Sequence, residues 1–212
     1  MRILLLSLLF TALGMSGATN PPPILLPAPI TTGGTGLMAA LAARQSQRDF
    51  NPAPLSPAIL SQLLWAAAGT NRPATGGRTV PSAMNSQEIE VYLVTVDGVY
   101  RYAGLAHRLE PVLAGDHRSL TGGQPFARQA PVSFVYVADT ARMPKAKPAD
   151  FERYNAMDAA FMVQNVYLLC AAEGLATVVH ELDRPPLAKL LELRPEQKII
   201  LAQAIGWPKP AP

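Results

Sequence analysis

Apolar and polar residues alternate most clearly just before the middle of the chain. Every second residue from Ile89 to Thr95 is apolar or β-branched, which is the period of a strand. Asp97-Gly98 then predicts a hairpin turn into a second strand. The continuous apolar runs PVSFVYVA and IILAQAIG predict a buried strand and a last strand. The strands predicted in this way cover residues 89–96, 99–102, 131–138 and 199–206.

Apolar residues spaced by three and four predict helices between these strands. The best marked helix follows Ser56, a good N-cap residue, has Pro57 at its first helical position and closes at Gly69. The longest helix stops at Gly174 and carries an apolar face that Asn165 interrupts. We expect that face to contain Phe161, Leu168, Ala172 and Leu175. The predicted helices cover residues 36–44, 56–69, 105–113, 150–173 and 186–193.

Strands separated by helices, with one hairpin, indicate an α+β layer fold. A chain of 212 residues is long enough for one domain with a sizeable core, here placed at residues 36–212. Residues 19–35 (TNPPPILLPAPITTGGT) are predicted to be an extended leader, because proline excludes helix and favours polyproline geometry. The apolar residues 24–26 within it need a surface to pack on, and a neighbouring subunit is one such surface.

The N-terminus has the pattern of a secretory signal peptide. Met1-Arg2 precedes an apolar run of 11 residues, ILLLSLLFTAL, and small residues follow at Ser16 and Ala18. We expect cleavage after Ala18 and a periplasmic or secreted protein with no stable membrane anchor. The alternative is an uncleaved anchor, which normally needs about 20 apolar residues.

Composition narrows the classes of partner. Hydrophobic residues make up 49% and charged residues 16% of the chain, as in globular proteins. The net charge of +3 falls to +2 without residues 1–18, which is too small to indicate nucleic acid binding. Cys170 is the single cysteine, so we expect a buried core thiol and no internal disulfide. The three histidines lack partners at ligand spacing, and we expect no metal site.

The segment Arg44-Gln45-Ser46-Gln47-Arg48 places two guanidinium groups and a hydroxyl within five residues at a helix end. Arginine offers a planar pair of donors and serine a further donor, a combination that can bind phosphate. The alternative is a solvated helix end whose cations lie near the negative end of the helix dipole.

The uncharged loop Pro81-Ser82-Ala83-Met84-Asn85-Ser86-Gln87 precedes the first strand. Its hydroxyl and amide groups both donate and accept, which suits the edge of a heterocycle better than a charge. The alternative is ordinary turn chemistry.

Two further places contain candidate chemistry. The amide of Asn165 needs a hydrogen-bond partner, which is either backbone or a ligand. His180 and Glu181 form a candidate acid/base pair, but adjacent residues on an extended segment point to opposite faces. The sequence contains no nucleophile elbow, P-loop or dinucleotide-binding GxGxxG motif.

These segments, in this order, resemble the nitroreductase family of FMN flavoproteins. The matching motifs are RQSQRDF at a helix end, LSQLLWAAAG, the loop PSAMNSQ before a strand, a long helix with an Asn that closes in Gly-Leu, and Gly-x-Pro after the last strand. The resemblance covers about residues 37 to 209. The loop after GGRT also resembles the branch that contains azoline oxidases of peptide modification. The resemblance implies a central, mostly antiparallel sheet flanked by helices, and an intertwined homodimer with two FMN sites at the interface.

The resemblance also implies the roles of individual residues. The arginine motif would hold the FMN phosphate and ribityl chain, the loop would lie against the isoalloxazine across the dimer interface, and the peptide N–H of Glu181 would face flavin N5 beside Leu182. No side chain is implied to be catalytic, because the flavin carries the chemistry. The implied cofactor-binding residues are Arg44, Gln45, Ser46, Arg48, Pro81, Ser82, Ala83, Asn85, Gln87, Asn165, Glu181, Leu182 and Lys209.

The implied activity is ping-pong transfer of electrons through flavin N5 from NAD(P)H to a nitroaromatic, a quinone or a similar small acceptor. Two alternatives are a flavin dehydrogenase or oxidase acting on a peptide or small metabolite, and a non-catalytic flavin-binding protein of the same fold. The sequence departs from the family at Gln45, where many members have a basic residue or His, and at Leu182, where many have Gly. Export is a further departure, because FMN must then be available outside the cytoplasm or be bound weakly there. A periplasmic location also weakens the expectation of NAD(P)H as donor, because that cofactor is scarce there.

Overall fold

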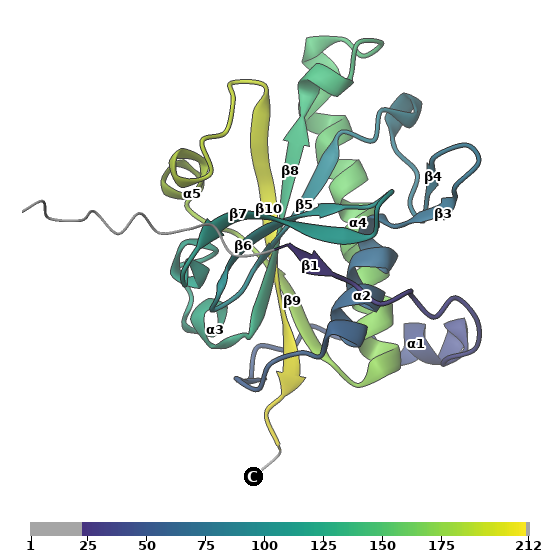
Figure 1. Cartoon of the computed structure of the whole chain (residues 1–212), viewed down its shortest axis with the longest axis vertical. Helices are drawn as coiled ribbons and strands as arrows, with labels where there is room; N and C mark the ends of the chain where they lie inside the picture. The colour runs from purple at the N-terminus through teal and green to yellow at the C-terminus, as the bar shows by residue number, and fades with distance from the viewer. Residues whose placement is uncertain (1–22, 211–212) are drawn as a thin grey trace, which may run out of the picture.

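The computed structural model describes residues 23–210 (Figure 1). The predicted signal peptide, with its cleavage after Ala18, and residues 19–22 of the leader lie outside this range. None of the helices within the described range is long and apolar enough to cross a membrane.

Eight strands form one antiparallel sheet in the order β1-β7-β6-β5-β8-β10-β2, with β9 paired to β10, and β3 and β4 form a separate hairpin. The predicted α+β class, with a central antiparallel sheet flanked by helices, is therefore confirmed. The elements are β1 Ile24–Leu25, α1 Leu37–Ala43, β2 Phe50–Asn51, α2 Pro57–Ala68, β3 Thr70–Arg72, β4 Gly77–Arg78, β5 Ile89–Val94, β6 Gly98–Ala103, β7 Arg108–Ala114, α3 Pro125–Gln129, β8 Val132–Asp139, α4 Phe151–Glu173, β9 Ala176–His180, α5 Arg184–Leu190 and β10 Gln197–Pro208.

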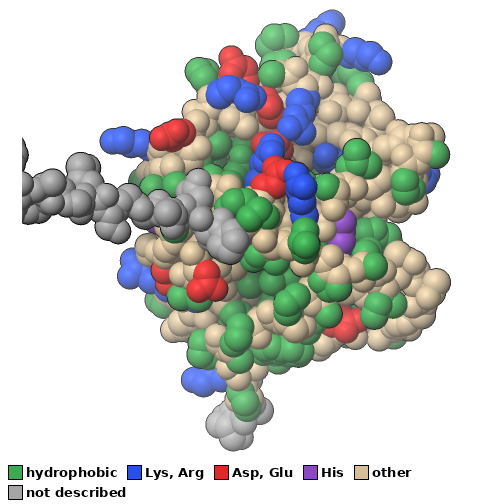
Figure 2. Space-filling model, viewed as in Figure 1, with side chains coloured by type: hydrophobic (Ala, Val, Ile, Leu, Met, Phe, Trp, Pro, Cys, Tyr) green, Lys and Arg blue, Asp and Glu red, His purple; other side chains and the backbone are tan. Residues whose placement is uncertain are grey.

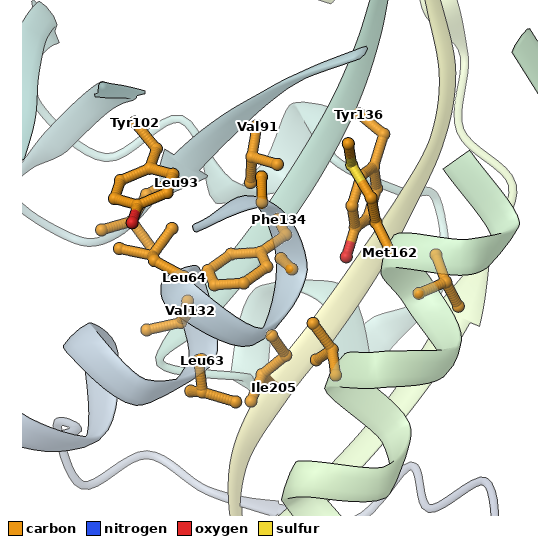
Figure 3. Packing of buried hydrophobic residues seen from close by; sticks show 14 of the residues in the cluster. Leu63, Leu64, Val91, Leu93, Tyr102, Val132, Phe134, Tyr136, Met162 and Ile205 are labelled. Atoms are coloured by element: carbon orange, nitrogen blue, oxygen red, sulfur yellow. The ribbon is translucent and has the colours of Figure 1, made fainter. Parts of the chain in front are cut away.

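The sheet is covered on both faces. Helices α2 and α4 pack on one face, and α5 packs on the other (Figure 1). Alternate residues of β5 therefore enter two different buried layers: Leu93 faces α2 and α4, whereas Tyr92 faces the α5 side. The aromatic rings of Phe134 and Tyr136 lie within the larger layer (Figure 3), and the Tyr136 hydroxyl donates to Gln203 Oε1 at 2.7 Å.

The helix boundary signals in the sequence are confirmed. Ser56 Oγ accepts from the backbone N–H of Ile59 at the start of α2, and Gly69 follows its last residue. Gly174 ends α4 with a φ of 68°, in the left-handed region that favours glycine.

The predicted helix over residues 105–113 is wrong, because this segment turns and forms β7. The turn is held at His107, which has a φ of 47°; its Nδ1 lies 2.8 Å from the Tyr102 hydroxyl and its Nε2 lies 2.7 Å from Ser61 Oγ. Pro111 cannot donate within a helix, whereas it is tolerated in this outer part of the sheet.

The predicted apolar face of α4 is also wrong in part, because Phe161 is 41% exposed. The face that enters the core is rotated relative to it and consists of Ala159, Met162, Val163, Val166, Tyr167 and Cys170. The prediction placed Asn165 within the apolar face, but that residue is half-buried at the border of the core-facing side. Cys170 is a buried free thiol, as predicted.

The apolar leader residues pack on their own chain. Strand β1 pairs with β7, and Ile24 and Leu26 contact the larger core layer, while Leu25 is 79% exposed. Ile24 and Leu26 therefore find the surface that they need on their own chain.

Candidate flavin site

The arginine motif follows α1 as an extended segment beside β9. The Gln47 backbone N–H donates to the Thr177 carbonyl at 3.0 Å. The Tyr167 hydroxyl, from α4, lies 2.9 Å from Ser46 Oγ and accepts from the Val179 backbone N–H at 2.9 Å. Tyr167 therefore fixes the segment against β9, and the sequence predictions did not include it. A buried tyrosine hydroxyl needs a partner, but the sequence does not show which one.

Three cations lie in or near this segment: Arg44, Arg48 and Lys209. The Arg44 guanidinium lies over the Tyr167 ring at 5.5 Å, and the Lys209 backbone N–H donates to the carbonyl of Asp49, the neighbour of Arg48. Within residues 23–210, none of Arg44, Arg48 and Lys209 forms an ion pair. This charge suits a phosphate group.

Several arginines elsewhere on the surface are paired with acids, although Arg72, Arg78 and Arg128 also form no ion pair within residues 23–210. Figure 2 shows basic and acidic side chains next to one another in the middle of one face. Among the ion pairs of the chain, Arg101 and Arg142 both bind Glu90, at 3.2 Å and 2.6 Å. The cations of the arginine motif therefore differ from the neutralised ones, which favours a binding role over a purely solvated helix end.

The loop over residues 81–87 is a tight turn with an unusual backbone. Met84, Asn85 and Gln87 have φ values of 54°, 54° and 50°, in the left-handed region that is unfavourable for residues other than glycine. Ser82 Oγ accepts from the Gln87 backbone N–H at 2.9 Å. Strain of this kind is often found at binding sites, where the surrounding structure maintains it.

The amides of the loop bond within the loop and its surroundings. Gln87 Nε2 donates to the Gly76 carbonyl at 3.0 Å and to Asn85 Oδ1 at 3.3 Å. Pro81, Met84 and Asn85 are exposed, and Ser82 and Ala83 are half-buried. The loop therefore has turn chemistry and an accessible, uncharged outer surface at the same time, so the two interpretations of the sequence do not exclude each other.

Two buried acids lie behind the loop, and the sequence predictions missed both. Asp158 of α4 accepts from the Ala83 backbone N–H at 2.7 Å through Oδ2. Glu88 follows the loop directly and is 0% exposed. Burial, together with the Asp158 carboxyl, raises the pKa of Glu88 to about 7, although the positive charge of Arg78 opposes the shift. Glu88 precedes an apolar strand, and no local pattern separates it from an ordinary exposed glutamate.

The side chains of the candidate acid/base pair, His180 and Glu181, lie in different surroundings at the end of β9. His180 is buried, its ring packs edge-on against Phe126, and burial lowers its pKa. Glu181 is exposed and pairs with Arg184 at 2.8 Å, while the Leu182 side chain is buried. His180 and Glu181 thus point to different surroundings, as the extended geometry predicts. A cavity of about 950 Å³ lies between α4, α5 and the first residues of β10, and Arg184, the partner of Glu181, is among its lining residues.

Asn165 has a structural partner. Its Nδ2 donates to the Ala66 carbonyl of α2 at 3.0 Å, so this amide joins α2 to α4. Of the two possibilities left open by the sequence, backbone bonding is the one that the structure contains.

One chain does not bring the arginine motif and the loop together. Both contact α4, but Ser46 does so at Tyr167 and Ala83 at Asp158. Nine residues of helix correspond to about 13.5 Å along its axis. Gln45 lines a small cavity beside the motif, with Gln47 and Tyr167.

Residues 41–207 match the family model described as nitroreductase family. The chain belongs to the nitroreductase family. A relative from Methanocaldococcus jannaschii, named as a candidate nitroreductase, is 32% identical over 148 residues, which are 65% of this chain and 74% of the relative. The predicted family and enzyme class, an FMN-dependent oxidoreductase, are thereby confirmed.

Solved structures of nitroreductases have the same fold. A candidate nitroreductase from Ralstonia eutropha JMP134 superposes with a TM-score of 0.85 at 42% identity, covering 94% of each chain. A candidate nitroreductase from Desulfovibrio desulfuricans, solved in complex with FMN, superposes with a TM-score of 0.59 at 20% identity, covering 84% of this chain and 89% of the other. At that identity the similarity concerns the fold.

Proposed function

We propose that this nitroreductase is an exported enzyme in which two copies of the chain together build each FMN site. The observation that carries the proposal is the strip of unpaired cations beside β9. In this proposal Arg44, Ser46, Arg48 and Lys209 hold the phosphate and ribityl chain, with Gln45 at the side of the strip. The uncharged loop over residues 81–87 faces the ring. The donors present fit FMN, because the charged end of the cofactor meets cations and its neutral ring meets amide and hydroxyl groups.

Exposed apolar residues support a homodimer in which the loop of one copy meets the ring that the motif of the other copy holds. Within one chain the motif and the loop contact α4 at points about 13.5 Å apart along its axis. Met157 and Phe161, one helical turn apart on α4, are 47% and 41% exposed, and Leu37 and Met38 of α1 are exposed as well. Exposed apolar side chains grouped on neighbouring helices favour a contact between copies.

The chain positions the reactants rather than reacting itself. When bound, the flavin supplies two-electron redox chemistry. The peptide N–H of Glu181 is proposed to bind the ring edge, and the buried Leu182 side chain supports that peptide. The cavity of about 950 Å³ between α4, α5 and β10 is large enough for a small ligand. A donor and an acceptor would use the cavity in turn, which gives ping-pong kinetics.

The proposed donor is NAD(P)H, and the proposed acceptor is a nitroaromatic, a quinone or a similar small molecule. Export rests on the pattern of residues 1–18, and it places the enzyme where nicotinamide nucleotides are scarce. The identity of the donor is therefore the part of the proposal that most needs a direct test.

Anaerobic titration of the flavin-loaded protein with NADH or NADPH tests this function. We expect the flavin absorbance to bleach with one equivalent of donor and to return after one equivalent of nitroaromatic or quinone. Flavin that chemical reductants bleach but neither nucleotide reduces would contradict the proposal. That result would favour a dehydrogenase or oxidase of a peptide or small metabolite if such a substrate bleaches the flavin, and a non-catalytic flavin-binding protein if none does.

A further inference from the structure

Glu88 is a buried carboxyl group directly behind the loop over residues 81–87. It is 0% exposed, and neither carboxyl oxygen has a hydrogen-bond partner within residues 23–210. The charged groups that act on it are Asp158 on α4 and Arg78 on β4. The positive charge of Arg78 also acts on Glu90, and burial and Arg142 lower the pKa of Arg78. An ionised Glu88 would therefore be a buried and poorly solvated anion beside another carboxylate.

Asp158 differs from Glu88, because its carboxylate accepts a hydrogen bond from the backbone of the loop. It is 2% exposed, and its Oδ2 accepts from the Ala83 N–H at 2.7 Å, a distance typical of a charge-assisted bond. Ala83 is the first residue of the turn that contains the left-handed residues Met84 and Asn85. Among the described hydrogen bonds of residues 81–87, this is the one that ties the loop to α4. Asp158 is thus placed to hold the strained turn in position.

We propose that Asp158 and Glu88 form a one-proton pair that positions the ring-facing loop, with the proton on Glu88 and the charge on Asp158. This inference rests on the proposed flavin site, since it names the groups that set the shape of its loop. Two protons on the pair would remove the charge that holds Ala83. No proton on the pair would leave two anions in one buried site, and their repulsion would weaken the anchor.

The pair makes the loop sensitive to pH in a defined direction. Folding raises the pKa of Glu88 from 4.5 to about 7, so the folded chain keeps a proton that the unfolded chain releases. The stability contributed by this proton is complete below about pH 4.5 and is lost as the pH rises through about 7. Above pH 7 Glu88 becomes ionised beside Asp158, their repulsion weakens the anchor of the loop, and FMN is expected to bind more weakly.

Two measurements on wild type, Glu88→Gln and Asp158→Asn test the proposal. The first is the thermal midpoint of the flavin-free protein from pH 4.5 to 9. The second is the FMN dissociation constant from pH 6.5 to 9, expressed as the ratio to Glu88→Gln so that titration of the phosphate cancels. Glu192→Gln, which alters an exposed acid outside the proposed site, is the matched control.

We expect the wild-type midpoint to fall between pH 4.5 and 7 relative to Glu88→Gln, and the ratio of dissociation constants to rise by up to tenfold per pH unit above 7. Asp158→Asn removes the neighbouring charge and should move both steps to lower pH, which keeps the test decisive if Glu88→Gln does not fold. The control should reproduce wild type.

Identical midpoint profiles for wild type and Glu88→Gln would overturn the assignment of a proton to Glu88. A fall of the thermal midpoint with pH, without a rise in the ratio of FMN dissociation constants, would overturn the role of the pair in positioning the loop. The flavin-free measurement is independent of cofactor binding, so failure of the flavin site and failure of the proton pair give different results.

Discussion

Replacing both Arg44 and Arg48 with alanine is expected to abolish retention of FMN while leaving the fold intact. Both side chains lie beside β9 without an ion-pair partner among the described residues, so their removal breaks no intramolecular ion pair. A hydrogen bond to a charged group contributes about 1.5–3 kcal/mol, and two such losses weaken binding by roughly 10²–10⁴-fold. Equilibrium titration of FMN, followed by flavin fluorescence, measures the change.

The matched control removes two arginines elsewhere. Arg108 and Arg153 are exposed and pair with Glu110 and Asp150. The double alanine variant at these positions has the same net charge as the test variant. A difference in FMN affinity between the two variants therefore reports the local contacts of Arg44 and Arg48 and not the change in net charge. Equal FMN affinity in the test variant and the control would place the phosphate site elsewhere on the molecule.

A single acidic substitution on α4, Phe161→Glu, is expected to separate the dimer and to release FMN at the same time. In a symmetric contact each copy contributes the same residue, so one change places two charges in the interface. Loss of a central aromatic contact costs on the order of 2–4 kcal/mol, which is roughly a 30–1000-fold weaker association. Sedimentation velocity at several protein concentrations measures the association, and absorbance of the sedimenting species measures bound flavin.

Val96→Glu provides the control for this substitution. Val96 is 54% exposed at the turn between β5 and β6, away from α1 and α4, and it receives the same charge. We expect this variant to remain dimeric and flavin-bound. A Phe161→Glu variant that stays dimeric, or one that is monomeric but binds FMN as wild type does, would contradict the composite site.

The residues of the proposed flavin site can be named from the sequence, because their types are rare in combination. Two arginines flanking a serine, and an uncharged loop before an apolar strand, are visible without any knowledge of contacts. Helix ends marked by Ser56 and Gly174 are predicted for the same reason, since capping is local.

The missed features depend on contacts between distant residues. Asp158 and Ala83 are 75 positions apart, and Tyr167 and Ser46 are 121 positions apart, so no local pattern connects them. The error at β7 has a similar origin, because the hairpin at His107 is held by Ser61, a residue of α2. The rotated face of α4 follows from packing against α2, which decides whether Phe161 or Met162 enters the core.

The absorbance spectrum of the purified full-length chain after incubation with FMN and gel filtration tests the central claim most directly. We predict that flavin absorbance co-elutes with the protein at one FMN per chain and that the bands shift relative to those of free FMN. A protein that elutes without flavin absorbance, although it is folded and was incubated with excess FMN, would contradict the claim that the arginine motif and the uncharged loop form a flavin site.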